Sequence, residues 1–77
     1  MSALDINEYV TDTADQRGRV NIGIKNASST VTYVVLDPDS MDRLDGPTTQ
    51  DSQSDGRLSI GSEFEGEEVT VGLLNVE

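Results

Sequence analysis

The stretch Gly18-Arg19-Val20-Asn21-Ile22-Gly23 recurs 38 residues later in the chain as Gly56-Arg57-Leu58-Ser59-Ile60-Gly61. The same offset aligns Val31-Thr32-Tyr33-Val34-Val35-Leu36 with Val69-Thr70-Val71-Gly72-Leu73-Leu74. Seven of the 19 positions from 18 to 36 are identical in the two copies. An internal duplication is the simplest explanation, and the alternative is a chance alignment of two generic β-hairpins.

Each copy has the pattern of two strands joined by a short loop. In the first copy Val20, Ile22 and Ile24 alternate with polar residues or glycine, which is typical of a strand with one buried face. The segment 30–36 has apolar residues on both faces, so we expect it to be covered on both sides. The chain is expected to form a single domain, 1–77, with repeat unit one at 18–36, a connecting segment at 37–55 and repeat unit two at 56–76.

These patterns predict an all-β fold. Two pseudo-symmetric hairpins would share one core as a small barrel or sandwich, because one hairpin alone is scarcely stable in water. In the connecting segment we expect one short helical turn over 41–44, and a mobile linker over 48–54, which contains no apolar residue. A short amino-terminal strand is expected around Leu4 and Ile6, extended through Val10.

The chain is strongly acidic. Its 77 residues include 15 Asp and Glu against 5 Lys and Arg, which gives a formal charge of −10 at pH 7. Self-repulsion reduces the small stability of such a domain, and salt screens it, with a Debye length of about 8 Å at physiological ionic strength and about 3 Å at 1 M. We therefore predict a halophilic-type surface that needs concentrated salt for full stability. The alternative is an ordinary soluble acidic protein.

The composition excludes several kinds of site. The absence of Cys and His removes disulfides, thiolate or imidazole zinc sites, and nucleophiles activated by histidine. A catalytic carboxylate needs burial or a close partner to shift its pKa, and so small a core offers little of either. We expect no enzyme activity and no cofactor. The segment 51–56 approaches an EF-hand loop, but Ser62 stands where the bidentate glutamate belongs, so no metal site is predicted.

No targeting signal is recognised in the sequence. The segment 1–10 has neither a basic n-region nor an apolar h-region, and no apolar run approaches the roughly 18 residues of a membrane span. The expected location is therefore cytoplasmic, with no membrane contact.

The stretch Asp15-Gln16-Arg17-Gly18-Arg19-Val20-Asn21-Ile22 resembles the opening of the swapped-hairpin regulators of the AbrB and SpoVT family. In that family an acidic residue precedes Gly-Arg-Val and an alternating strand, and Asp55-Gly56-Arg57-Leu58-Ser59-Ile60 repeats the resemblance. Its members are transcription factors and antitoxin domains that bind DNA as intertwined β-dimers through arginine-bearing surfaces. The resemblance implies that Arg17, Arg19 and Arg57 bind nucleic acid.

Several interpretations of function are open from the sequence. The first is a small non-catalytic binding module whose partner is an unknown protein, the second a DNA-binding regulator, and the third a subunit whose strand edges pair with another chain. Under the second interpretation Arg19 and Arg57 are expected to contact DNA, and the alternative is cross-strand pairing with neighbouring carboxylates on the exposed face. The duplication favours a monomeric pseudo-dimer over a homodimer, because one chain already supplies both halves.

Overall fold

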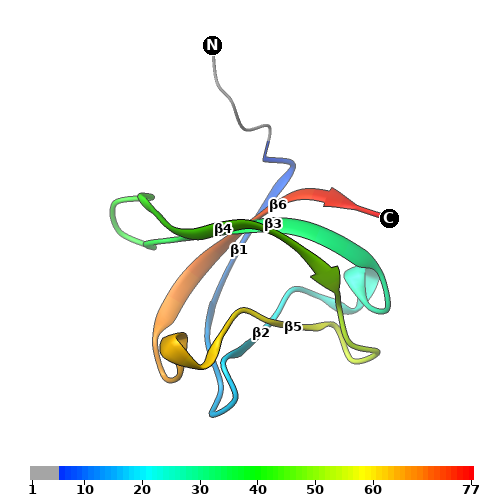
Figure 1. Ribbon diagram of the computed structural model, residues 1–77, viewed down its shortest axis with the longest axis horizontal. Coiled ribbons are helices and arrows are strands. Elements are labelled where there is room, and N and C mark those ends of the chain that lie inside the picture. Colours follow the sequence, from blue (N-terminus) through cyan, green and yellow to red (C-terminus); the bar gives the residue numbers. More distant parts are fainter. Residues whose placement is uncertain (1–5) are drawn as a thin grey trace.

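The computed structural model describes residues 6–77, which form six β-strands and two short 3₁₀ turns (Figure 1). The strands are β1 (Glu8–Thr13), β2 (Arg19–Asn21), β3 (Thr30–Leu36), β4 (Arg43–Asp51), β5 (Arg57–Ser59) and β6 (Glu68–Val76). The turns η1 (Ile24–Asn26) and η2 (Ser62–Phe64) follow β2 and β5 at matching positions. The predicted all-β class is therefore confirmed.

The strands form two antiparallel layers. The larger sheet has the strand order β1-β6-β3-β4, and β2 and β5 form a separate two-stranded layer. Figure 1 shows that this small layer lies along one side of the large sheet, so the fold is a small sandwich and not a closed barrel. The core between the layers consists of the buried side chains of Ala14, Val20, Ile22, Val31, Tyr33, Val35, Leu58, Ile60, Val69, Val71 and Leu73.

The two repeats are interleaved. We call residues 6–36, which carry β1, β2 and β3, the first half, and residues 43–77, which carry β4, β5 and β6, the second half. Every strand pairing in the described chain joins one half to the other: β1 with β6, β3 with both β4 and β6, and β2 with β5. The predicted strands are present, but the hairpin pairing expected within each repeat is wrong. Period-two alternation indicates which face of a strand is buried, and it does not specify the partner strand.

Two glycines allow the halves to approach closely. Gly18 and Gly56 occupy matching turns before β2 and β5, with φ of +73° and +86°. Their carbonyl oxygens accept backbone hydrogen bonds from the opposite half, at 2.9 and 2.8 Å. A Cβ at Gly18 would overlap the carbonyl oxygen of Gly61, and one at Gly56 would lie 2.7 Å from the carbonyl oxygen of Gly23. The repeated glycines are therefore required both by the turn conformation and by the contact between halves.

The connecting segment contains a strand, so the predicted helical turn over 41–44 and mobile linker over 48–54 are wrong. Strand β4 pairs with β3 at the edge of the large sheet, and the hydroxyl oxygens of Thr32 and Thr49 lie 2.8 Å apart across this pairing. An edge strand keeps one side in water, so threonine and other polar residues can replace the apolar pattern by which buried strands are recognised.

The first described residues extend the pairing of β1. The backbone N–H of Asn7 donates to the carbonyl oxygen of Leu73 at 2.8 Å, and the side chain of Ile6 lies against Gly72, whose missing side chain leaves room for it. The remainder of the predicted amino-terminal strand, around Leu4, lies outside the described residues. No helix within residues 6–77 is long and apolar enough to cross a membrane.

Candidate binding face on strands β2 and β5

The three arginines singled out from the sequence lie together on the outer side of the β2–β5 layer. Val20 and Leu58 are opposed in the β2–β5 register and are buried in the core. Side chains alternate along a strand, so Arg19 and Arg57, one residue away, point to the opposite side. We call this surface the arginine face and define it by Asp15, Arg17, Arg19, Gln53, Asp55 and Arg57.

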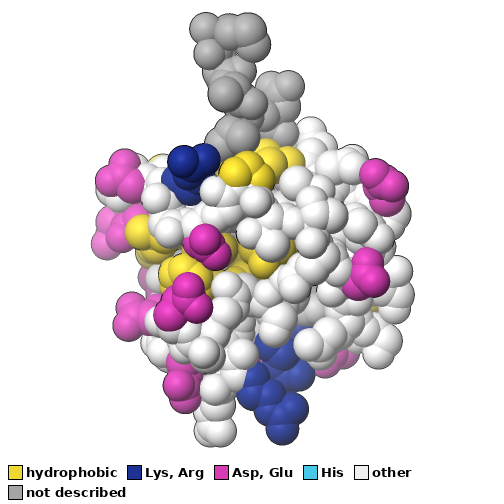
Figure 2. Space-filling model, in the orientation of Figure 1, with side chains coloured by type: hydrophobic (Ala, Val, Ile, Leu, Met, Phe, Trp, Pro, Cys, Tyr) yellow, Lys and Arg dark blue, Asp and Glu magenta, His cyan; other side chains and the backbone are white. Residues whose placement is uncertain are grey.

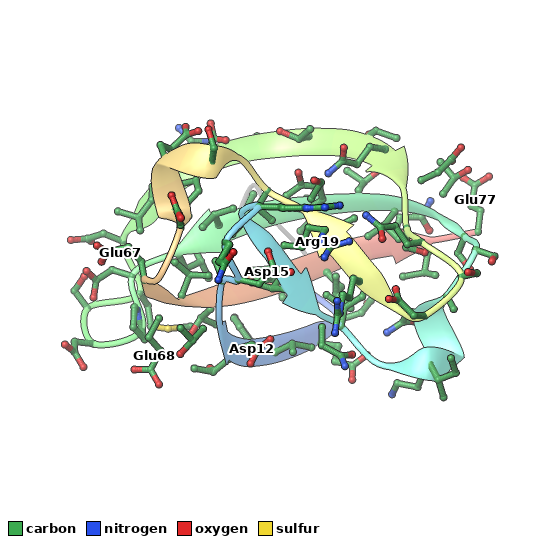
Figure 3. All side chains as sticks on the ribbon, turned by 90° about the horizontal axis from the view of Figure 1, so that it is seen from below. Asp12, Asp15, Arg19, Glu67, Glu68 and Glu77 are labelled. Carbon is green, nitrogen blue, oxygen red and sulfur yellow. The ribbon has the colours of Figure 1, made fainter. Side chains whose placement is uncertain are left out.

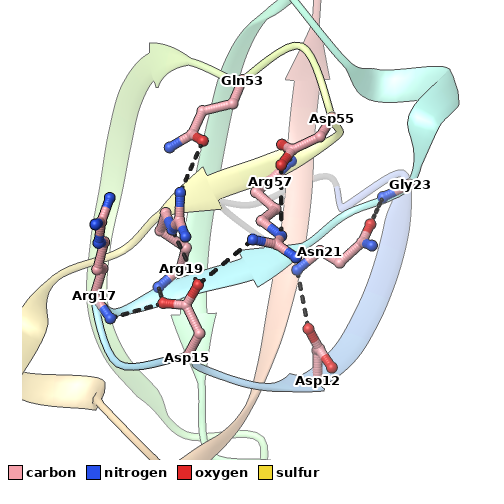
Figure 4. Close-up of polar contacts among 9 residues, drawn as sticks. All are labelled: Asp12, Asp15, Arg17, Arg19, Asn21, Gly23, Gln53, Asp55 and Arg57. Atoms are coloured by element: carbon pink, nitrogen blue, oxygen red, sulfur yellow. Dashed lines mark hydrogen bonds and ion pairs between the residues drawn. The ribbon is translucent and has the colours of Figure 1, made fainter.

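Asp15 is the central acceptor of the arginine face. Its Oδ1 accepts hydrogen bonds from the backbone N–H groups of Arg17 and Arg19, at 2.8 and 3.0 Å. Its Oδ2 accepts a hydrogen bond from Nε of Arg19 at 3.0 Å and lies 3.9 Å from Nη1 of Arg57 (Figure 4). Because Arg57 belongs to the second half, this carboxylate joins the two halves on the outer side of the layer.

Further partners from the second half fix two of the three guanidinium groups. Nη1 of Arg19 donates to Oε1 of Gln53 at 3.2 Å, and Nε of Arg57 lies 3.6 Å from Oδ2 of Asp55. Arg19 and Arg57 therefore pair with neighbouring carboxylates, as one interpretation of the sequence expects, but these carboxylates lie in the turns before β2 and β5 and not opposite the arginines on a partner strand. Arg17 is exposed, and its guanidinium makes no ion pair within the described part of the chain.

The hydrogen bonds to Asp15 also lower the pKa of its carboxyl. The backbone N–H of Arg19 is the largest influence on Asp15 and lowers the pKa of its carboxyl, outweighing the opposite effect of desolvation. The N–H of Arg17 and the guanidinium of Arg19 act in the same direction. Asp15 is therefore an anion at neutral pH.

The arginine face is the most basic part of an acidic molecule. Figure 2 shows the largest group of Lys and Arg side chains at the end of the molecule where β2 and β5 lie, with Asp and Glu spread over the rest of the visible face. Figure 3 places Asp15 and Arg19 over the middle of this layer, and Glu67, Glu68 and Glu77 at the periphery. An open depression of about 380 Å³ is lined by Asp15, Gln16, Arg17 and Arg19.

Sequence reasoning found the arginines but missed the residues that hold them. In the sequence Asp15 is only the acidic residue of the repeated motif, and Gln53 lies in the segment that is predicted to be a linker. The 38-residue offset contained the missing signal, because it aligns Asp15 with Gln53, and both side chains contact Arg19.

The EF-hand-like segment has a structural role. Ser52 is buried, and its Oγ donates to the carbonyl oxygen of Asn26 at 2.5 Å while accepting the N–H of Ser29 at 3.0 Å. Among residues 6–77, no group of three or more Asp or Glu side chains is placed to hold a metal ion. This segment therefore connects the halves through a neutral hydrogen bond.

Comparison of the chain with protein-family models, with curated proteins and with solved structures finds no match.

Proposed function

We propose that the protein is a non-catalytic binding module with a salt-adapted acidic surface, and that its arginine face contacts a protein partner. The observation that carries this proposal is that two of the three guanidinium groups are held by Asp15, Gln53 and Asp55 on the same face. A fixed pattern of guanidinium, carboxylate and amide groups complements a protein surface of mixed polarity. Arginine is also one of the residues enriched in protein interfaces and their hot spots.

The charges favour a protein over a nucleic acid as the partner. Affinity for phosphates depends on cations that displace counterions, and it falls steeply as salt rises. On the arginine face two carboxylates offset two of the three positive charges, and the chain as a whole carries −10. A protein partner is recognised through hydrogen bonds and shape as well as charge, so it is less affected by this balance.

The ionisation of the face supports a binding role without catalysis. General acid–base catalysis is most efficient when the pKa lies near the working pH. The pKa of Asp15 is lowered, away from neutral pH, by the backbone N–H groups of Arg19 and Arg17 and by the guanidinium of Arg19. Asp15 therefore orients the arginines and does not transfer protons.

The acidic residues outside the arginine face support the salt-adapted surface. Among the described acidic residues only Glu8, Asp15 and Asp55 take part in ion pairs. The remaining carboxylates have no cationic partner to offset their mutual repulsion, so dissolved cations must do so.

A DNA-binding regulator is the second candidate. It is favoured by the interleaving of the halves, which brings arginines from both onto one face, as the resemblance to the swapped-hairpin regulators implies. The guanidinium of Arg17, which makes no ion pair with residues 6–77, is the group best placed to contact a phosphate or a base edge on this face.

Photo-crosslinking in cells distinguishes the two candidates. A benzophenone-bearing residue at position 17 probes the arginine face, and the same residue at position 49, on the large sheet, is the matched control. The proposal predicts a discrete protein adduct from position 17 and none from position 49. Adducts with DNA from position 17 would support the regulator instead. Equal labelling from both positions would show that the arginine face is not the binding surface.

A further inference from the structure

Neither half of the chain has any strand pairing of its own. Every strand that pairs with β1, β2 or β3 lies in the second half, and every strand that pairs with β4, β5 or β6 lies in the first. A single connection, the turn at residues 37–42, keeps the two halves in one molecule. A second copy of the chain presents the same set of strands, so it can satisfy every one of these pairings.

The connecting turn contributes little to the core. Its residues 39–42 are exposed, and Met41 adopts a positive φ of 63°, which is unfavourable for a residue with a side chain. The turn is closed by polar contacts, in which Oδ1 of Asp37 accepts the N–H groups of Asp39 and Ser40 at 2.8 and 3.1 Å. Asp37, Asp39 and Asp42 also place three carboxylates in six residues. Extending this turn therefore breaks polar contacts at its exposed residues 39–42, buries or exposes no core side chain among them, and relieves the unfavourable φ of Met41.

We propose that two copies of this chain exchange halves to form a closed dimer. In each lobe of this dimer the first half of one copy folds with the second half of the other. The dimer preserves all strand pairings and both cores, and its two-fold symmetry closes the assembly so that no open strand edge is added. Each lobe carries a complete arginine face, because it contains one first half and one second half. Asp15 and Arg57 of that face then come from different copies.

The exchange must join opposite halves, because the two halves are not interchangeable. The buried Ser52 of the second half donates to the carbonyl oxygen of Asn26 in the first half. The 38-residue offset aligns Ser52 with Ala14 and Asn26 with Phe64. Phe64 packs against the apolar core that includes Ala14, so the second copy of this contact is apolar. Two first halves would therefore place Asn26 beside Ala14, which has no hydroxyl to donate.

The two halves of one chain are joined by a short turn, and this determines the protein concentration at which two chains exchange halves. Two modules joined by a short flexible linker meet at an effective concentration of about millimolar. Exchange therefore competes with intramolecular folding when the chain folds at about millimolar concentration. Since neither half has a sheet of its own, monomer and dimer interconvert only through unfolding, and a dimer formed during refolding persists when it is diluted.

Complementation between two unfolded full-length variants tests the proposal. Val20→Asp places a charge in the core from the first half, and Leu58→Asp does the same from the second half; both wild-type side chains are buried. When the two variants are refolded together at about millimolar concentration in 3 M KCl, one lobe of each exchanged dimer is wild type. We expect the mixture to recover about half of the native β-sheet signal at twice the monomer mass.

The matched control is a mixture of Val20→Asp with Ile22→Asp. Both substitutions lie in the first half, so no lobe can be free of them, and no recovery is expected. A Val20→Asp and Leu58→Asp mixture that behaves as the sum of its components overturns the proposal.

A second measurement uses the wild-type chain and does not depend on variant stability. Nitrogen-15-labelled and unlabelled copies are refolded together at about millimolar concentration and then diluted. Native mass spectrometry should detect a mixed-isotope dimer that survives dilution. A population that is monomeric directly after dilution contradicts exchange.

Discussion

Oδ2 of Asp15, in the first half of the chain, lies 3.9 Å from Nη1 of Arg57, in the second half. The same oxygen accepts a hydrogen bond from Nε of Arg19 at 3.0 Å. One carboxylate therefore connects the outer sides of β2 and β5, and the arginine face exists only when the two halves are interleaved. The pairing of the halves and the candidate binding surface are thus one structural feature.

The role of Asp15 predicts a pH-dependent effect of the Asp15→Asn substitution. The folded-state pKa of this carboxyl lies below its ordinary value of 3.8, so its stabilisation is fully present above that value and is lost as the pH falls through the folded-state pKa. Asp15→Asn should lower the free energy of unfolding at pH 7, and its difference from the wild type should vanish at low pH. Urea unfolding in 3 M KCl at a series of pH values measures both effects.

Glu65→Gln is the control for this prediction, because it also removes one negative charge and Glu65 makes no ion pair in the described structure. Relief of the net negative charge should leave it as stable as the wild type at pH 7, or more stable. The assignment fails if Asp15→Asn and Glu65→Gln show the same pH profile.

Concentrated salt is predicted to stabilise the fold. Most of the described carboxylates have no cationic partner, and their repulsion is screened much more strongly at 3 M than at 0.1 M KCl. We expect the higher concentration to raise the free energy of unfolding by at least about 1 kcal/mol. For a domain of this size, that corresponds to an increase in Tm of at least about 4–8 °C. Thermal unfolding followed by circular dichroism measures it. Equal Tm values would mean that the surface is acidic without being salt-adapted.

The close approach of the halves at Gly18 predicts a large cost for Gly18→Ala. Gly66 is the matched control, because it has a similar φ of +75° but no atom within 4 Å of its Cβ position. Gly66→Ala should cost about 1–2 kcal/mol, from the backbone conformation alone. In Gly18→Ala the new methyl group also meets the carbonyl of Gly61, so we expect more than about 3 kcal/mol in urea unfolding. Similar costs for the two variants would contradict this contact.

The buried hydrogen bond of Ser52 predicts a smaller but specific loss. Ser52→Ala removes the donor to Asn26 and the acceptor for Ser29, and it should destabilise the fold by about 1–3 kcal/mol. Ser54→Ala, at an exposed position two residues away, should change the stability by less than about 0.5 kcal/mol. Chemical unfolding of both variants at equal salt gives the comparison, and indistinguishable values would exclude a structural role for this hydroxyl.

The positions of the strands can be predicted from the sequence more reliably than the pairing between the strands. Alternation placed Val20 and Leu58 in the core, but two strands with the same period can pair within a repeat or across repeats. The choice depends on contacts between distant residues, such as the fit of Gly18 against Gly61. Strand β4 escaped prediction because its exposed edge removes the need for apolar residues.

The sequence predicts the arginines of the arginine face but not the residues that contact them, because these contacts also join distant parts of the chain. The repeated Gly-Arg motif marked Arg19 and Arg57, and the family resemblance added Arg17. Their partners come from both halves, and Gln53 carries no motif of its own. Only the register of β2 against β5 shows that these residues meet.

Strands β2 and β5, from opposite halves, form one layer that carries the arginine face. Nuclear Overhauser contacts in a labelled sample in 3 M KCl test it most directly. We predict cross-strand contacts between Val20 and Leu58, and between Thr11 and Thr70 of the β1–β6 pairing. Backbone cross-strand contacts that instead pair residues 19–21 with residues 30–36 in a local hairpin would contradict the interleaved fold, and with it the arginine face.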